Sequence, residues 1–279
     1  MTIFELLKKT IKRLVVGNIE SATAEAEIII AEMLNIPRTN LFIVGPNIVD
    51  EKIKCQVETV VMRRIAGEPL QYIQGRAYFM NLCLEVAPGV LIPRPETELL
   101  VERICREAPM GGAICDVGTG SGAIALAIAF ERPDLQVTGV DISDAALAIA
   151  ERNRINNQLN NVTLLKSDLL TALNNMSFDY IAANLPYISQ AEYEQLPTEI
   201  KDHEPKNALF AADNGLEIIK RAAWQMPALM KDSAQVIFEM GATQGIELKE
   251  FLTSIGKFKQ IEIIKDLNQL DRFISCIKR

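Results

Sequence analysis

The sequence predicts an α/β protein with a Rossmann-like, doubly wound sheet that follows a small helical region. Three observations support this prediction. Apolar strand-like runs alternate with helical patterns from residue 99 onward, a glycine-rich turn follows the first of these runs, and no strand-like alternation occurs before residue 70. The chain has 279 residues, 49% of them hydrophobic, so we expect about two domains with a substantial core.

Charge and cysteine content narrow the class of protein. The net charge is −7, and residues 1–74 hold nine Lys or Arg and nine Asp or Glu, so the excess acid lies beyond residue 74. This distribution does not favour nonspecific binding to nucleic acid. The five cysteines form no C-x-x-C motif and His203 is the only histidine, which argues against disulfides, metal sites and His-based triads.

The sequence also bears on location. No apolar run approaches 18 residues, so no membrane span is expected. The first residues lack the basic region and the long apolar core of a signal peptide. We therefore expect a protein of the reducing cytoplasm.

Residues 1–74 are expected to form a helical bundle. A capping box at residues 2–5 begins the first helix. A second helix fits residues 21–34, with Ala24, Ile28, Ala31 and Met33–Leu34 on one side. Asp50 caps a third helix. The bundle contains no motif that indicates chemistry, so we expect it to pack or dock, with docking to a protein substrate as the hypothesis to test.

Residues 75–95 are expected to link the two domains. Aromatic and branched residues on both sides of Asn81 predict a β-hairpin. Pro93 and Pro95 then fix the backbone, and Pro95 suits the first position of a helix. Two interpretations of this proline segment stay open: a rigid linker, or a wall of a cofactor pocket.

The second domain is expected to span residues 96–279. Its predicted strands cover residues 112–117, 136–140, 162–165, 178–183 and 234–238, and a final hairpin covers residues 258–264 and 272–277. Ligands bind at the carboxyl ends of strands in such open sheets. The single tryptophan, Trp224, lies in a predicted helix and is expected in the core.

A glycine turn and an acid define a candidate cofactor site. The turn is Gly118-Thr119-Gly120-Ser121-Gly122, in which glycines allow the backbone to approach a ligand closely. Asp141 ends the next strand, 21 residues after Gly120, at the spacing of an acid that binds ribose hydroxyls. The same pattern fits a dinucleotide site, so an NAD-dependent oxidoreductase is an alternative.

The stretch Asn184-Leu185-Pro186-Tyr187 follows the fourth strand and suggests a different chemistry. An amide or exocyclic amine nitrogen is a poor nucleophile because its lone pair is delocalised. Two acceptors, the Asn184 side-chain oxygen and the Leu185 carbonyl, would localise that pair, while Tyr187 would stack on the flat target. The alternative is an ordinary strand-end turn in which Asn184 satisfies its own backbone.

At these motifs the chain resembles the HemK-type protein-(glutamine-N5) methyltransferases that modify peptide chain release factors. The likeness covers most of the chain and rests on four stretches: residues 91–98, residues 116–123, residues 184–188, and Glu204-Pro205 with residues 208–210, Asp213 and Gly215. The resemblance implies an N-terminal helical bundle, a hairpin linker and a seven-stranded class I methyltransferase domain. It also implies transfer of a methyl group from S-adenosylmethionine to the glutamine of a Gly-Gly-Gln loop.

The resemblance assigns roles by position. It places the turn from Gly118 to Gly122 along the methionine part of the cofactor, Asp141 on its ribose, and Asp168 with Leu169 near its adenine. It places the stretch from Asn184 to Tyr187 on the substrate glutamine, with Asn184 also beside the cofactor. The family motif is Asn-Pro-Pro-Tyr, and Leu185 replaces its first proline but supplies the same backbone carbonyl. Leu169 stands where relatives often carry an aromatic ring.

The expected protein is a monomeric enzyme that acts on release factors and binds neither nucleic acid nor membrane. Three alternatives stay open. A sister class methylates a ribosomal protein glutamine and shares these motifs. A DNA adenine-N6 methyltransferase uses the same tetrapeptide but normally needs a basic groove, which this acidic chain does not suggest. A protein that binds a release factor without catalysis is the third alternative, with Leu185 as the change that abolishes turnover.

Overall fold

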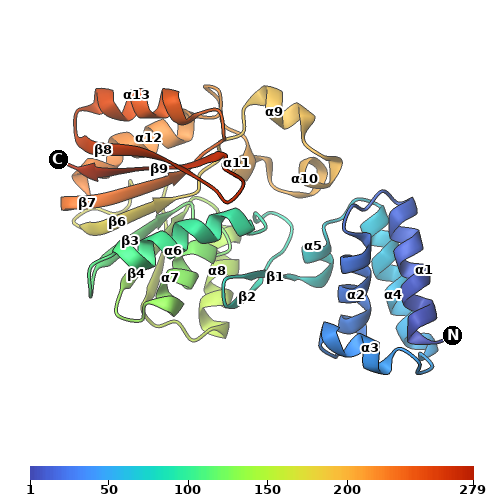
Figure 1. Ribbon diagram of the computed structural model, residues 1–279. Coiled ribbons are helices and arrows are strands. Elements are labelled where there is room, and N and C mark those ends of the chain that lie inside the picture. Colours follow the sequence, from blue (N-terminus) through green and yellow to red (C-terminus); the bar gives the residue numbers. More distant parts are fainter. The chain divides into compact units, whose positions relative to one another are not determined.

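The computed structural model describes residues 1–279, and the chain divides into two units, Met1–Gln74 and Gly75–Arg279 (Figure 1). Each unit has a hydrophobic core of its own. No helix in either unit is long and apolar enough to cross a membrane.

The first unit is entirely helical apart from a single bridge between Thr2 and Ile48. The predicted caps are confirmed: the Thr2 hydroxyl accepts from the Glu5 N–H, and the Asp50 carboxylate accepts from the Lys52 N–H. The elements are α1 (Ile3–Val16), α2 (Ala22–Met33), η1 (Arg38–Asn40), α3 (Leu41–Val44), α4 (Glu51–Ile65) and α5 (Leu70–Gln74).

The side of α2 that the sequence indicated is buried in part: Ala31 is buried, and Met33 and Leu34 pack against the core of the first unit. Ile28 is exposed, whereas Ala26, Ile29 and Ile30 are almost completely buried. Four apolar residues, Ile28 to Ala31, follow one another in this helix, so periodicity alone did not determine which stripe faces α1 and α4.

The second unit begins with the predicted hairpin of β1 (Arg76–Phe79) and β2 (Leu82–Glu85), which pair antiparallel. Met80, with a φ of 50°, begins the two-residue turn. Phe79, Leu82 and Leu84 are buried with residues of α6 (Glu98–Glu107) and α7 (Ala123–Glu131). The hairpin is therefore part of the core of this unit.

A seven-stranded sheet forms the centre of the second unit. The strand order is β5-β4-β3-β6-β7-β9-β8, in which neighbouring strands are parallel except at β9, which runs antiparallel to both β7 and β8. The strands are β3 (Ala113–Val117), β4 (Gln136–Asp141), β5 (Val162–Lys166), β6 (Phe178–Ala183), β7 (Met230–Glu239), β8 (Phe258–Lys265) and β9 (Asp271–Lys278). The predicted strands and final hairpin are confirmed.

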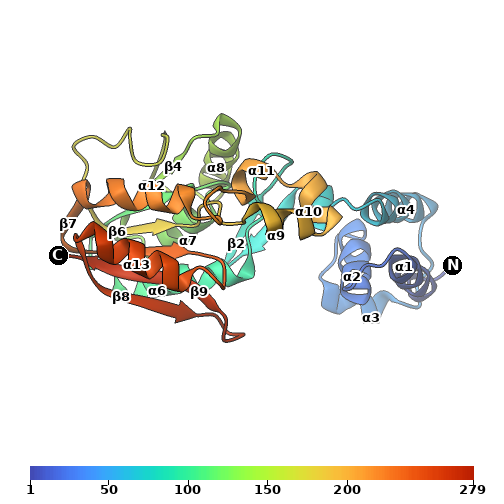
Figure 2. The ribbon, with the colours of Figure 1, turned by 90° about the horizontal axis from the view of Figure 1, so that it is seen from above.

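Helices cover both faces of the sheet, so the sheet is the middle of three layers (Figure 1). β6 shows why: Tyr180 and Ala182 are buried in the core beneath α6 and α7, while Ile181 and Ala183 are buried in the core beneath α12 and α13. α12 and α13 lie next to each other (Figures 1 and 2). The remaining helices are η2 (Pro95–Thr97), α8 (Asp144–Asn156), α9 (Gln190–Gln195), α10 (Thr198–His203), α11 (Lys206–Leu209), α12 (Glu217–Gln225), η3 (Met226–Ala228) and α13 (Gly245–Ile255).

Trp224 lies in a helix as predicted, but its expected burial is wrong. The side chain is 61% exposed, while Ala222 and Ala223 are completely buried. Trp224 thus falls on the outer side of α12, where its ring meets the edge of Phe251 at a centroid distance of 6.2 Å. An aromatic residue at helical spacing did not indicate which side of the helix faces the sheet.

Candidate active site

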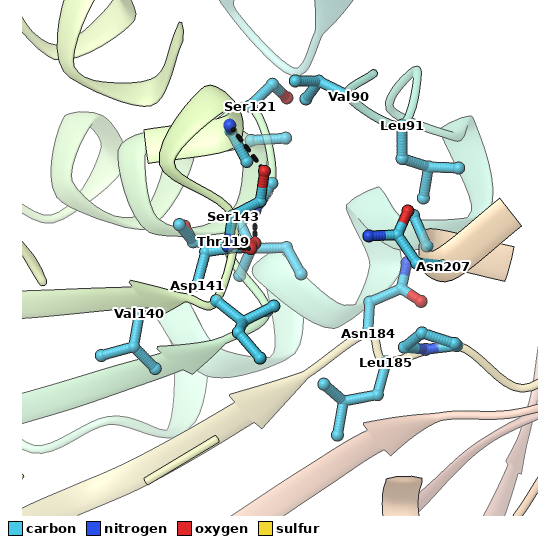
Figure 3. A pocket seen from close by; sticks show the side chains of 18 of the residues that line it. Val90, Leu91, Thr119, Ser121, Val140, Asp141, Ser143, Asn184, Leu185 and Asn207 are labelled. Carbon is cyan, nitrogen blue, oxygen red and sulfur yellow. Dashed lines mark hydrogen bonds between the residues drawn. The ribbon is translucent and has the colours of Figure 1, made fainter. Parts of the chain in front are cut away.

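A cavity of about 560 Å³ lies at the carboxyl ends of β3, β4, β5 and β6 (Figure 3). These four strands are parallel neighbours, so the residues that follow each of them meet at one edge of the sheet. Two further segments, residues 89–97 and residues 206–210, complete the wall. All lining residues belong to the second unit.

The glycine turn after β3 has the conformation that its composition predicts. Gly118, Gly120 and Gly122 have φ values of 77°, 58° and 87°, which only glycine adopts readily. The N–H groups of Gly118 and Thr119 both donate to the carbonyl of Val140 and hold the turn against β4. A Cβ atom at Gly118 would lie 2.9 Å from the Leu185 side chain, so the turn and the strand-end stretch are packed closely.

Asp116 stabilises this turn from inside the protein. One of its oxygens, Oδ2, accepts from the Thr119 hydroxyl at 2.6 Å and from the Ala125 N–H at 3.1 Å, while Oδ1 is buried without a partner. Burial raises the pKa of the Asp116 carboxyl to about 7, and the two bonds only partly oppose that effect. The turn thus rests on a titratable group that the cavity does not reach.

Asp141 lies at the end of β4 with both carboxylate oxygens bonded to the backbone. Oδ2 accepts from the Gly120 N–H and Oδ1 accepts from the Ser143 N–H, each at 2.9 Å. Each oxygen keeps a second lone pair for a ligand hydroxyl. The carboxylate lines the cavity together with Thr119 and Ser143 (Figure 3).

Asp168 and Leu169 line the cavity after β5. The Asp168 carboxylate accepts from the Arg221 guanidinium at 2.9 Å, and Arg221 itself lines the cavity. Leu169 has a φ of 52° and is 9% exposed, so its side chain supplies an apolar surface in place of an aromatic ring.

Asn184 follows β6 on the side of the cavity opposite Asp141 (Figure 3). Its side-chain Nδ2 donates to the Thr97 hydroxyl at 3.2 Å, which leaves Oδ1 without a recorded partner. Leu185 and Pro186 also line the cavity, with the Leu185 side chain only 4% exposed. Tyr187 does not line it, because its hydroxyl donates to the buried Glu239 carboxylate at 3.1 Å.

The proline segment is a wall of the cavity, which decides between its two interpretations. Pro93 and Arg94 line it, and Arg94 donates to the Glu204 carboxylate at 2.5 Å. Glu204, which is 6% exposed, also accepts from the Ile92 N–H at 3.3 Å. This buried carboxylate therefore connects the proline segment to residues 206–210, the other segment of the cavity wall.

The cavity brings together most of the residues that the sequence indicated, apart from Gly122 and Tyr187. Gly122 instead begins α7, where a Cβ atom would lie 2.8 Å from the Leu126 side chain. Residue-level reasoning missed Thr97, Glu239, Asn207 and Arg221. Thr97 lies in one of the stretches that carry the family resemblance, but nothing in the sequence pairs it with Glu239, 142 residues away.

The sheet and the cavity define the class of the protein. The family model described as "Methyltransferase small domain" matches residues 95–245, and the model described as "PrmC N-terminal domain" matches residues 5–75. A methyltransferase structure from Pyrococcus furiosus superimposes with a TM-score of 0.55 over 79% of this chain and 97% of its own, at 17% identity, which shows the same fold. The chain thus contains a methyltransferase domain with a methyltransferase fold.

Curated relatives narrow the class. Release factor glutamine methyltransferase from Thermodesulfovibrio yellowstonii is 36% identical over 89% of this chain and 90% of its own length. The enzyme of the same name from Rhodopirellula baltica is 38% identical over 93% of this chain and 90% of its own. The chain belongs to the release factor glutamine methyltransferase family. The predicted family, fold class and enzyme class are confirmed, and S-adenosylmethionine agrees with that class as the methyl donor.

Proposed function

We propose that this protein transfers a methyl group from S-adenosylmethionine to the side-chain amide nitrogen of the glutamine in the Gly-Gly-Gln loop of peptide chain release factors. The observation that carries the proposal is the placement of Asn184: its amide lines the same cavity as the glycine turn and Asp141. Methyl donor and acceptor would therefore meet in a single site. Membership in the family identifies the glutamine as the acceptor.

The residues at the cavity fit this cofactor. The left-handed glycines at Gly118 and Gly120 leave room for its amino acid part beside backbone N–H groups. Asp141 accepts ribose hydroxyls with its remaining lone pairs, and Asp168 with Leu169 lies at the adenine end. When bound, the cofactor supplies a methyl group that its positively charged sulfur makes electrophilic.

The protein's part in the reaction is orientation. The substrate amide donates its two hydrogens to Asn184 Oδ1 and to the Leu185 carbonyl, which turns the nitrogen lone pair toward the methyl carbon. The nitrogen would form its bond to that carbon as the carbon–sulfur bond breaks, the cofactor would leave as the neutral thioether, and the proton would pass from the nitrogen to solvent. Pro186 stiffens the turn, and Tyr187 holds its far end through Glu239.

We further propose that the protein works in the cytoplasm as a monomer and binds its substrate as a protein. The second unit carries the whole charge of −7, which disfavours a phosphate backbone as partner. The first unit, with no lining residue of the cavity, serves to dock the release factor.

The test is a transfer assay with isotope-labelled S-adenosylmethionine. A release factor, a ribosomal protein and DNA are offered separately, and mass spectrometry locates the methyl group. We expect label on the Gly-Gly-Gln glutamine, and none when that glutamine is replaced by alanine. Faster labelling of the ribosomal protein or of DNA, or no labelling of any substrate, would contradict the proposal.

A further inference from the structure

A chain of hydrogen bonds leads from Asn184 into the interior. Asn184 Nδ2 donates to Thr97 Oγ1 at 3.2 Å, Thr97 Oγ1 donates to Glu239 Oε2 at 2.6 Å, and the Tyr187 hydroxyl donates to Glu239 Oε1 at 3.1 Å. Thr97 and Glu239 are only 3% and 1% exposed. The three elements that supply these groups are η2, the end of β6 and the end of β7.

The register of the sheet explains how these groups meet. Ala183 on β6 pairs with Phe238 on β7, so the next residues, Asn184 after β6 and Glu239 at the end of β7, lie at the same level. Thr97 ends η2 and places its hydroxyl between their two side chains. The carboxylate thus lies behind the cavity wall and does not line the cavity.

The direction of each bond follows from counting hydrogens. A threonine hydroxyl has one hydrogen, and Thr97 gives it to the Glu239 carboxylate, which in its ionised form can only accept. The Thr97 oxygen must then accept from its other neighbour, so Asn184 presents its NH2 group to Thr97. The Asn184 Oδ1 atom then has no hydrogen-bond partner within the protein.

We propose that Glu239 is a positioning residue that acts through Thr97 to fix the orientation of the Asn184 amide, so that oxygen and not nitrogen faces the substrate. The proposal rests on the proposed function, because an acceptor is useful only if the incoming group carries NH hydrogens. The same carboxylate holds Tyr187 and therefore fixes both ends of the stretch from Asn184 to Tyr187.

The pKa of the Glu239 carboxyl is raised above its usual value, mainly by burial. Glu96 raises this pKa further. The bonds from Thr97 and Tyr187 and the positive charge of Arg272 lower it. The two donated hydrogen bonds are those that a buried carboxylate requires.

Substitution of the carboxylate by an amide of the same shape tests the proposal. In Glu239→Gln the new NH2 group donates to Thr97, whose hydroxyl is then free to donate to Asn184 Oδ1 and favour the flipped amide. We expect kcat for glutamine methylation to fall about tenfold to a hundredfold, with a smaller change in KM. The cofactor Kd should stay within about twofold, because Glu239 does not line the cavity.

Matched substitutions of Thr97, the middle residue of the hydrogen-bond chain, separate its positioning role from its packing. Thr97→Val keeps the shape but removes the hydroxyl, so its kcat should fall as in Glu239→Gln, whereas Thr97→Ser keeps the hydroxyl and should stay near the parental kcat. The control is Thr138→Val, the same chemical change at a buried threonine of β4 outside the cavity, which should leave kcat unchanged.

A measurement that does not depend on turnover is the NMR chemical shift of the Asn184 side-chain NH2 group in isotope-labelled protein. This shift should change in Glu239→Gln and Thr97→Val but not in Thr138→Val. Parental kcat in a folded Glu239→Gln protein whose Asn184 resonances are unmoved would overturn the inference. If the resonances move but the parent methylates no glutamine, the hydrogen-bond chain stands and the proposed function is wrong.

Discussion

Asp141 illustrates, at the scale of one residue, how the backbone holds a cavity-lining side chain in place. Backbone N–H groups of Gly120 and Ser143 fix both carboxylate oxygens before any ligand arrives, so little ordering remains to be done on binding. Its place at the end of β4 was predicted from the apolar run that precedes it, and its role toward a ribose from its distance to the glycine turn. The two backbone bonds were not, because local spacing does not reveal how a loop folds over a side chain.

Replacement of Asp141 by alanine should weaken binding of S-adenosylmethionine by roughly 1.5–3 kcal/mol, the range for a hydrogen bond to a charged group. Asp141→Asn keeps one acceptor for the loop and separates loss of charge from loosening of the turn. Calorimetry measures both affinities. An unchanged affinity in Asp141→Ala, or tight NAD binding by the parent, would remove the assignment.

Asn184 and its neighbours show where sequence reasoning at this scale ends. The tetrapeptide itself indicated an acceptor at the end of a strand, and the cavity contains it. The partners that orient it, Thr97 and Glu239, come from distant parts of the chain and are brought together only by the order of β6 and β7. For the same reason, the sequence predicted a stacking role for Tyr187 but not its bond to Glu239.

At the scale of elements, the turn after β3 combines left-handed backbone at three glycines with a buried acid. Three positive φ angles at glycines allow the tight path, and Asp116 holds the turn to the start of α7 through Thr119 and Ala125. The glycines were readable from the sequence because no other residue adopts these angles readily. The altered pKa of Asp116 was not, because it results from complete burial.

This burial predicts a pH dependence of stability. The folded pKa of Asp116 is raised from 3.8 to about 7, so the folded state holds a proton that the unfolded state loses first. Asp116 therefore contributes its full share of the free energy of unfolding below about pH 4. This contribution, up to about 4 kcal/mol, is lost as the pH rises through about 7. Asp116→Asn should abolish this contribution.

Thermal or urea unfolding of the parent and of Asp116→Asn between pH 4 and pH 8 measures the effect. The free energy of unfolding of the parent should decrease relative to that of the variant across this range. A constant difference between the two proteins would show that Asp116 has an ordinary pKa in the folded state.

At the scale of the whole molecule, the sequence predicted the fold class of each unit better than it predicted which side of each helix is buried. The helical first unit and the alternating second unit were read from periodicity and from caps, which are local signals. The exposure of Ile28 on α2 and the outward position of Trp224 were not predicted, since both depend on the partners that a helix meets after folding.

The division into two units leads to a prediction about the substrate. A shortened chain that begins at Gly75 retains the complete sheet, the hairpin and every residue that lines the cavity. It should fold and bind S-adenosylmethionine as tightly as the whole chain, yet methylate an intact release factor at least about tenfold more slowly, which corresponds to a loss of about 1.4 kcal/mol in docking.

Calorimetry and transfer kinetics on the shortened and complete chains check this expectation. A short Gly-Gly-Gln peptide serves as the control substrate, because it lacks the surface that the first unit would hold, and both chains should methylate it equally. If the shortened chain binds cofactor and methylates the intact release factor at the rate of the complete chain, the docking role is wrong.

The most direct test of the account is the rate of methyl transfer by Asn184→Ala to a release factor at saturating substrate. The Asn184 acceptor matters most as the amide nitrogen becomes tetrahedral and positive, so kcat should fall by on the order of 10²–10³, with cofactor affinity nearly unchanged. A correctly folded Asn184→Ala protein that keeps a kcat near the parental value would contradict the claim that methyl transfer takes place at this strand end.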